Sequence, residues 1–163
     1  MKNILFYTDT PQIGGAELQI YLLAKFLNKE KFKPTLACSN FRQLDGWCTK
    51  FKKEGIEVIR LNVKNKHDFK HLSKLKKIIK EKEIDLLHIH VWNPASCRFA
   101  FLAGSQTKTP IITTEHDPFK LNIIKNLFKK YTLNKISKIV TISENNKKLL
   151  TKLYPKHKNK IAM

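Results

Sequence analysis

Cysteine, glycine and acidic residues are all scarce in this 163-residue chain, which has 3 cysteines, 5 glycines and 13 Asp and Glu residues. The cysteines are too few and too widely spaced for a disulfide framework or a zinc pattern, which favours a reducing compartment, the cytoplasm. No apolar run approaches the roughly 20 residues that a membrane-spanning helix needs. The apolar patch near the N-terminus is short, and we expect it to be a first strand rather than a signal peptide.

Familiar cofactor motifs are missing as well. The sequence has no G-x-G-x-x-G, which argues against a dinucleotide cofactor, and no GxxxxGK[ST] loop, which excludes a P-loop ATPase. His88 and His90 share one face of a predicted strand and could form a zinc pair. No third ligand follows at metal-binding spacing, so we expect neither a metal nor a bound cofactor.

Basic residues dominate the charge, with 32 Lys and Arg residues and a formal net charge of +19. Almost all of them are lysines, which act as hydrated point charges and suit a diffuse anionic surface. A genome rich in AAA codons is an alternative source of the lysine excess. A nucleic-acid-binding module is a further alternative, but the lysines spread over several helices and no RRM, KH or helix-turn-helix signature is present.

Short apolar runs alternate with helical patterns along the whole chain. The predicted strands are residues 3–8, 34–38, 56–61, 85–91, 110–116 and 136–143, and the predicted helices are residues 15–30, 45–55, 68–83, 94–104, 118–133 and 144–154. In the first helix, Leu18, Leu22 and Phe26 recur every four residues, with Tyr21, Ala24 and Leu27 beside them, which predicts one apolar face. The alternation predicts one Rossmann-like α/β domain, with a parallel sheet of six or seven strands and helices on both faces.

Polar residues gather where the predicted strands end, which is where ligands bind to such sheets. His88 lies deeper in its strand and is expected to be a core histidine, whereas His90 is nearer the strand end and could reach a ligand. His116 follows a strand and precedes a helix, and its neutral imidazole could donate or accept a hydrogen bond with a substrate. The alternative is that His116 caps the next helix, although Asp117 could also do this.

Gly14 and Gly15 lie between the first predicted strand and the first helix. Free N–H groups at a helix entrance can bind phosphate or the polar edge of a sugar. The alternative is that the glycines only let the chain turn. Glu17, in the first turn, complements the helix dipole and would discourage a highly charged phosphate, which makes a sugar hydroxyl an equally suitable partner.

Four segments together resemble the N-terminal domain of the family 4 glycosyltransferases, which have the GT-B fold. They are GGAE at residues 14–17, DLLHIHVWNP at 85–94, PIITTEHD at 110–117 and KIVTISENNKKLL at 138–150. The resemblance implies that residues 1–163 form the acceptor-side Rossmann-like half of a GT-B fold. It also implies that the C-terminal domain, which binds the nucleotide-sugar, is absent from this chain.

The resemblance further implies a retaining hexosyltransferase that moves a sugar from a nucleotide-sugar to a glycan or lipid-linked acceptor, in cell-surface polysaccharide or glycolipid synthesis. His116 would lie beside the transferred sugar as the catalytic residue. The substrate-binding residues would be Gly14, Gly15, Glu17, His90, Asn93, Asp117 and Ser143. Alone, the chain is expected to have little activity, because the groups that neutralise the leaving diphosphate are missing. A non-catalytic sugar-binding subunit, or one partner of a split enzyme, is the alternative.

The segment from residue 118 to residue 160 carries twelve lysines and one acid, Glu144. Its first helix has an apolar stripe formed by Leu121, Ile124, Phe128 and Tyr131. One interpretation is a core-facing helix with a solvated back. The other is docking on anionic lipid at the inner face of the cell membrane, through Lys120, Lys125, Lys129 and Lys130. Family 4 members that act on lipid-linked acceptors use a basic N-terminal face in this way.

Overall fold

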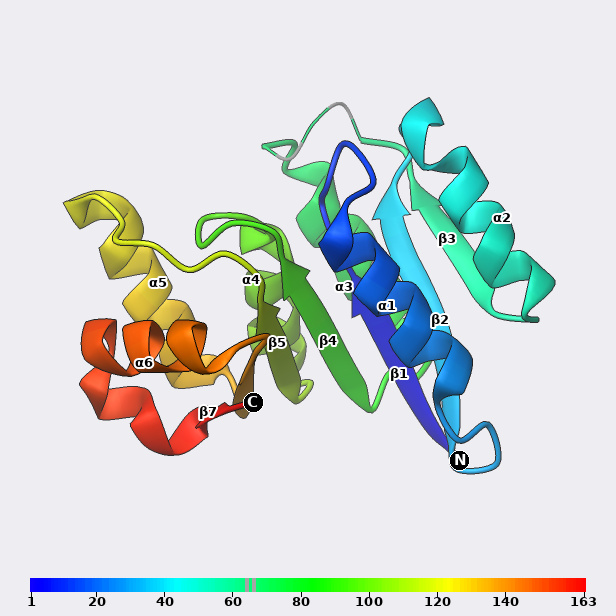
Figure 1. The fold of residues 1–163 in the computed structure, drawn as a ribbon. Coiled ribbons are helices and arrows are strands. Elements are labelled where there is room, and N and C mark those ends of the chain that lie inside the picture. The colour runs from blue at the N-terminus through cyan, green and yellow to red at the C-terminus, as the bar shows by residue number, and fades with distance from the viewer. Residues whose placement is uncertain (64, 66) are drawn as a thin grey trace.

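The computed structural model describes residues 1–63, 65 and 67–163, and the strands in this part of the chain form one seven-stranded parallel sheet (Figure 1). The strands are β1 (Lys2–Tyr7), β2 (Phe32–Ser39), β3 (Glu57–Leu61), β4 (Leu86–Val91), β5 (Ile111–Glu115), β6 (Lys138–Thr141) and β7 (Ile161–Ala162). Their order across the sheet is β3-β2-β1-β4-β5-β6-β7. The direction of winding therefore reverses between β1 and β4, which is where a ligand crevice is expected.

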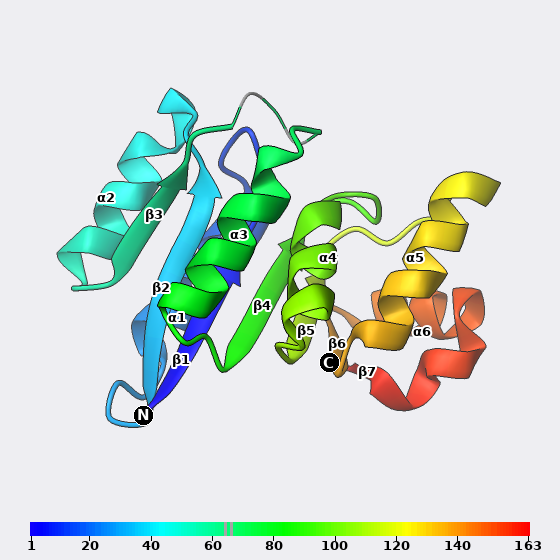
Figure 2. The same ribbon diagram turned by 180° about the vertical axis from the view of Figure 1, so that it is seen from behind.

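Helices cover both faces of the sheet. They are α1 (Gly15–Phe26), α2 (Asp45–Lys53), α3 (Lys70–Glu81), α4 (Arg98–Thr107), α5 (Ile123–Lys135) and α6 (Glu144–Leu153). Helices α1 and α2 lie on one face, α3 and α4 lie on the opposite face, and α5 and α6 lie beyond α4 towards β7 (Figures 1 and 2). The predicted Rossmann-like fold class is confirmed.

The strands separate the core into two apolar clusters because successive side chains point to opposite faces. On one face, Phe6 packs in a cluster with Ile20 of α1 and Phe51 of α2. On the other face, Leu5 and Tyr7 belong to a larger cluster with residues of α3 and α4. The described residues form no helix long and apolar enough to cross a membrane.

The predicted apolar face of α1 meets the core only in part. Ala24 is buried, and Tyr21 and Leu27 pack against the core, as does Ile20, which was not predicted. Leu18, Leu22 and Phe26 are exposed, so that part of the prediction is wrong. A four-residue spacing identifies a stripe on a helix but does not say which stripe meets the sheet. Here the stripe that meets the sheet contains Ile20 and Ala24, both of which are fully buried.

Two predicted helices begin later than expected. Helix α4 starts at Arg98 rather than at residue 94, because residues 92–97 form a loop after β4. Helix α5 starts at Ile123 rather than at residue 118, and the side chain of Asn122 caps it by accepting a hydrogen bond from the Lys125 amide at 3.0 Å. The interpretation of His116 or Asp117 as the cap of this helix is therefore wrong.

Candidate functional site

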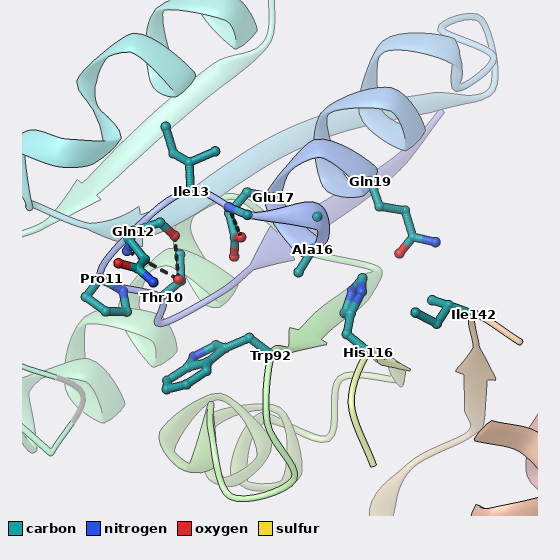
Figure 3. Close-up of a pocket in the computed structure, with 12 residues that line it drawn as sticks. Thr10, Pro11, Gln12, Ile13, Ala16, Glu17, Gln19, Trp92, His116 and Ile142 are labelled. Carbon is teal, nitrogen blue, oxygen red and sulfur yellow. Dashed lines mark hydrogen bonds between the residues drawn. The ribbon is translucent and has the colours of Figure 1, made fainter. Parts of the chain in front are cut away.

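A cavity of about 520 Å³ opens at the carboxyl edge of the sheet, a size in the range of small-molecule sites. It is lined by residues 10–17, Gln19, Trp92, His116 and Ile142, which follow β1, β4, β5 and β6. Figure 3 shows His116 facing the start of α1, with Trp92 and Ile142 to its sides. The fold thus brings together four of the predicted site residues: Gly14, Gly15, Glu17 and His116.

The two glycines leave this cavity open. Gly14 has an extended backbone, with φ −148°, so a left-handed conformation does not explain it. A Cβ atom at Gly15 would meet no other atom within 4 Å, and one at Gly14 would meet only the Glu17 carboxylate at 3.5 Å. The amides of Gly15 and Ala16 are first-turn donors that have no partner within the helix. A side chain at Gly15 would therefore fill space that a ligand could use.

Glu17 holds the glycine turn from inside. Its carboxylate is buried and accepts a hydrogen bond from the Gly14 amide at 2.9 Å, and its backbone carbonyl accepts one from Trp47 Nε1 at 2.9 Å. Burial raises the pKa of the Glu17 carboxyl, and the hydrogen bonds from the backbone partly offset this. The structure therefore gives Glu17 a role in shaping the cavity, and its contact with a substrate stays a prediction.

Three histidines form a line from the sheet to the cavity. The ring centroids of His88 and His90 are 4.3 Å apart, and those of His90 and His116 are 5.6 Å apart. Burial lowers the pKa of all three imidazoles, that of His88 to about 4. All three are therefore neutral at pH 7, and His116 can bind a sugar hydroxyl without a charge.

The expectation that His90 reaches a ligand directly is wrong. His90 is fully buried and does not line the cavity, whereas His88 is the less buried of the two. His116 covers the end of β4, and its Nε2 atom lies 3.3 Å from Nδ1 of His90. His90 can therefore act on a ligand only through His116.

This contact selects the tautomers of the two histidines. The other ring nitrogen of His90, Nε2, is buried and has no hydrogen-bond partner among the described residues. A proton there would be an unpaired buried donor, which is costly, so we expect His90 to carry its proton on Nδ1 and donate it to His116 Nε2. Neutral His116 then carries its own proton on Nδ1, where it is a hydrogen-bond donor.

Asp9 supports the loop beside the cavity, a role that the sequence analysis did not assign. It is buried at the end of β1, and its two carboxylate oxygens accept hydrogen bonds from Trp92 Nε1 at 2.9 Å and from the Cys97 amide at 2.7 Å. Both ends of the loop 92–97 are thereby fixed, including Cys97, whose φ of 57° is left-handed. The signal in the sequence was an acid directly after a buried strand.

The comparison of the sequence with protein families decides what kind of domain this is. Residues 13–163 match the family model for Glycosyltransferase Family 4. The chain belongs to this family. No curated protein matches the sequence at a significant level.

Solved structures with similar folds are described as complexes with UDP or as an enzyme named for a UDP-sugar. HepE of Anabaena in complex with UDP is 13% identical with a TM-score of 0.74, over 99% of this chain and 43% of that one. MnaA of S. aureus with UDP is 14% identical with a TM-score of 0.74, and the match covers 100% of this chain and 44% of MnaA. A putative UDP-N-acetylglucosamine 2-epimerase from Listeria monocytogenes is 15% identical with a TM-score of 0.72, and the match covers 98% of this chain and 44% of the epimerase. The family 4 domain thus spans less than half the length of these structures.

Three other predicted site residues lie outside the cavity of the family 4 domain. The Asn93 side chain accepts a hydrogen bond from the Ala95 amide at 2.9 Å and shapes the loop after β4. Ser143 caps α6 by accepting a hydrogen bond from the Asn146 amide at 3.2 Å. Asp117 is exposed. None of these three lines the cavity, so their contact with a substrate stays a prediction.

The prediction that Lys129 contacts a membrane is wrong. Its side chain is 2% exposed and forms an ion pair with Glu115, at the end of β5. Part of the expected core-facing stripe points outward, since Ile124 is 80% exposed, whereas Leu121, just before α5, is buried and Phe128 is half-buried. Lys120, Lys125 and Lys130 are exposed, so their membrane contact stays a prediction.

In the part of the chain that the structure describes, no group of three His, Cys, Asp or Glu side chains could hold a metal ion. His88, one member of the candidate zinc pair, instead lies 2.9 Å from Thr114 Oγ1 through its Nε2 atom. Nδ1 of His90, the other member, is occupied by His116. The expectation that the reaction needs no metal stays a prediction.

Replacing Asp9 by asparagine is expected to lower the free energy of unfolding by about 1–3 kcal/mol, because an amide nitrogen would face one of two buried N–H donors. Urea denaturation measures the change. The matched control is Asp45→Asn, since Asp45 is 62% exposed in its ion pair with Arg60 and should contribute little. Equal effects of the two substitutions would contradict the anchoring role of Asp9.

Proposed function

We propose that this family 4 domain is the N-terminal, acceptor-side half of a retaining glycosyltransferase that transfers a sugar from a nucleotide-sugar to a glycan or lipid-linked acceptor. The observation that carries the proposal is the cavity in which the Gly14–Gly15 turn faces His116 at the switch point of the sheet. The UDP bound to HepE and to MnaA supports a nucleotide-sugar as the donor. Cell-surface polysaccharide or glycolipid synthesis is the proposed setting.

In this proposal the start of α1 meets the donor. The amides of Gly15 and Ala16 and the helix dipole favour the phosphate and the polar edge of the sugar. His116 donates a hydrogen bond from Nδ1 to a sugar hydroxyl or carbonyl oxygen, and it remains neutral throughout. The groups that neutralise the leaving diphosphate would come from a second domain, so the chain alone should bind the donor weakly.

Replacing Gly15 by phenylalanine is expected to weaken the binding of UDP-glucose by at least about tenfold, because the ring would fill the space in front of α1. Saturation-transfer NMR measures the affinity. Gly46→Phe is the matched control, because Gly46 also lies in the first turn of a helix and a Cβ atom there meets nothing within 4 Å. Equal affinities of the two variants would contradict the proposed site.

We also propose that α5 docks on anionic membrane at the cytoplasmic face. Ile123, Ile124 and Leu127 are 81%, 80% and 63% exposed. Contiguous exposed apolar patches mark interaction sites. Lys120 and Lys130 are exposed nearby, and residues 118–143 contain no acid. Each lysine near such a surface contributes about 1 kcal/mol.

Liposome co-sedimentation tests the membrane proposal. Binding should require anionic lipid, should weaken with added salt, and should weaken when Ile123 is replaced by serine. Binding that ignores lipid charge and salt would contradict the proposal.

A further inference from the structure

A second cavity, of about 490 Å³, lies between α4 and α5, which are neighbours on the back of the sheet (Figure 2). Its apolar wall is formed by Phe69, Pro94, Ala95, Phe99, Phe101, Leu102, Ile124 and Phe128. The loop 92–97 borders both cavities, since it contributes Trp92 to the first and residues 94–96 to the second. We call the second cavity the α4–α5 groove.

Three polar side chains in the wall of the groove already have partners within the protein. The Ser96 hydroxyl donates to the backbone carbonyl of Asn93 at 2.8 Å, and the Thr132 hydroxyl donates to that of Lys129 at 2.8 Å. The ammonium of Lys129 is paired with Glu115. A sugar or a peptide in the groove would therefore bury polar groups without partners, which is costly.

Two cations of the groove remain without an acidic partner among the described residues. Arg98 lies in the first turn of α4 with Nη2 2.9 Å from Nδ1 of His67, and Lys125 lies in the first turn of α5 and is exposed. No acid lines the groove. Both cations line the groove at the starts of helices that follow strands, and therefore near the carboxyl edge of the sheet.

We propose that the α4–α5 groove binds one alkyl chain of an anionic lipid, with the phosphate of the lipid on Arg98 and Lys125. The apolar wall suits the chain, and the unpaired cations suit the head group. Ile124 belongs both to the groove and to the exposed face of α5, so a chain can enter from a membrane on which α5 lies.

This inference rests on the proposed function, because it gives the acceptor a chemical class: a lipid that carries a phosphate. The phosphate would lie on the same edge of the sheet as His116, separated from the first cavity by one loop of six residues, 92–97. An acceptor group attached to that phosphate could then extend past the loop towards the sugar.

Dodecyl phosphate, used below its micelle concentration, is the probe for the groove. Calorimetric titration of the full chain should give saturable binding at one site. Leu102→Trp should weaken it by at least about tenfold by filling the groove, and Lys125→Ser by about fivefold by removing one cation. Neutral dodecyl maltoside should bind more weakly than dodecyl phosphate, and inorganic phosphate should not compete.

The control is Ile123→Ser, which lies on the exposed face of α5 but does not line the groove. It should weaken vesicle binding and leave the affinity for dodecyl phosphate unchanged. Ala95→Phe is a second filling variant, and circular dichroism verifies the fold of each. Non-saturable binding, equal binding of the neutral detergent, or unchanged affinity in the folded filling variants would overturn the proposal.

The same variants separate this inference from the proposed function. Leu102→Trp should retain the affinity of the wild-type chain for UDP-glucose, because Leu102 does not line the first cavity. If dodecyl phosphate binds as expected and UDP-glucose does not bind, the proposed donor site is contradicted and lipid binding in the α4–α5 groove is supported. If UDP-glucose binds and dodecyl phosphate does not, the groove fails alone.

Discussion

Replacing Lys129 by alanine is expected to lower the free energy of unfolding by about 3–5 kcal/mol. The Lys129 ammonium, 2% exposed, is the ion-pair partner of the Glu115 carboxylate, which is 1% exposed. Alanine would leave that carboxylate buried without a cation, which is costly because a charge loses its hydration there. Urea denaturation at pH 7 measures the loss.

Two further variants test the cause of this effect. Lys129→Met combined with Glu115→Gln removes both charges, so it should recover much of the lost stability. Lys125→Ala is the matched control on the same helix, since Lys125 is exposed and should change stability little. If Lys125→Ala and Lys129→Ala destabilise the chain equally, the buried pair does not hold α5 on the sheet.

The chain is also expected to lose stability steeply as the pH falls from about 6.5 to about 4. Burial lowers the pKa of five imidazoles, those of His71, His88, His90, His116 and His157. The unfolded chain therefore takes up protons near pH 6.5 while the folded chain does not, and the equilibrium shifts towards unfolding. Each histidine contributes up to about 1.4 kcal/mol per pH unit within its window.

The direction of the pKa shifts decides whether the free energy of unfolding rises or falls with pH. A lowered folded pKa means that the stability is fully present above the ordinary histidine value of 6.5 and is lost as the pH falls; for His88 the loss continues to about pH 4. The Glu17 carboxyl, whose pKa is raised by burial, acts in the opposite direction, but it is one group against five imidazoles.

Urea denaturation at a series of pH values between 7 and 4 measures this slope. His88→Gln should reduce the slope by up to the amount that corresponds to one bound proton. Gln can still approach the Thr114 hydroxyl that lies beside His88. His67→Gln is the control, because His67 is exposed. A slope that is unchanged in His88→Gln would contradict the account of the buried histidines.

The sheet could be predicted from the sequence because its signals are local. The apolar runs that end in polar residues identified the strands, and their alternation with helices set the parallel arrangement. The orientation of two helices could be predicted only in part. In α5 the inward side chains include Lys129 beside Leu133, and the partner of Lys129, Glu115, lies fourteen residues earlier on another element. Periodicity gives no signal for such a pair, because a lysine ordinarily counts as an outward residue.

The candidate site was predictable in outline for a similar reason. Gly14, Gly15 and His116 all follow strands, and the carboxyl ends of parallel strands meet at one edge of the sheet. The supporting contacts were not predictable. The hydrogen bonds of Asp9 and the contact between His90 and His116 exist only once the ends of β1, β4 and β5 lie side by side.

Mapping of UDP-glucose by NMR chemical shifts tests the proposed donor site most directly. Titration into the ¹⁵N-labelled chain should shift the amides of Gly15 and Ala16 and the ring of His116, which come from two elements far apart in the sequence. Shifts confined to the opposite edge of the sheet, for example around Thr109, with those three signals unmoved, would contradict the account.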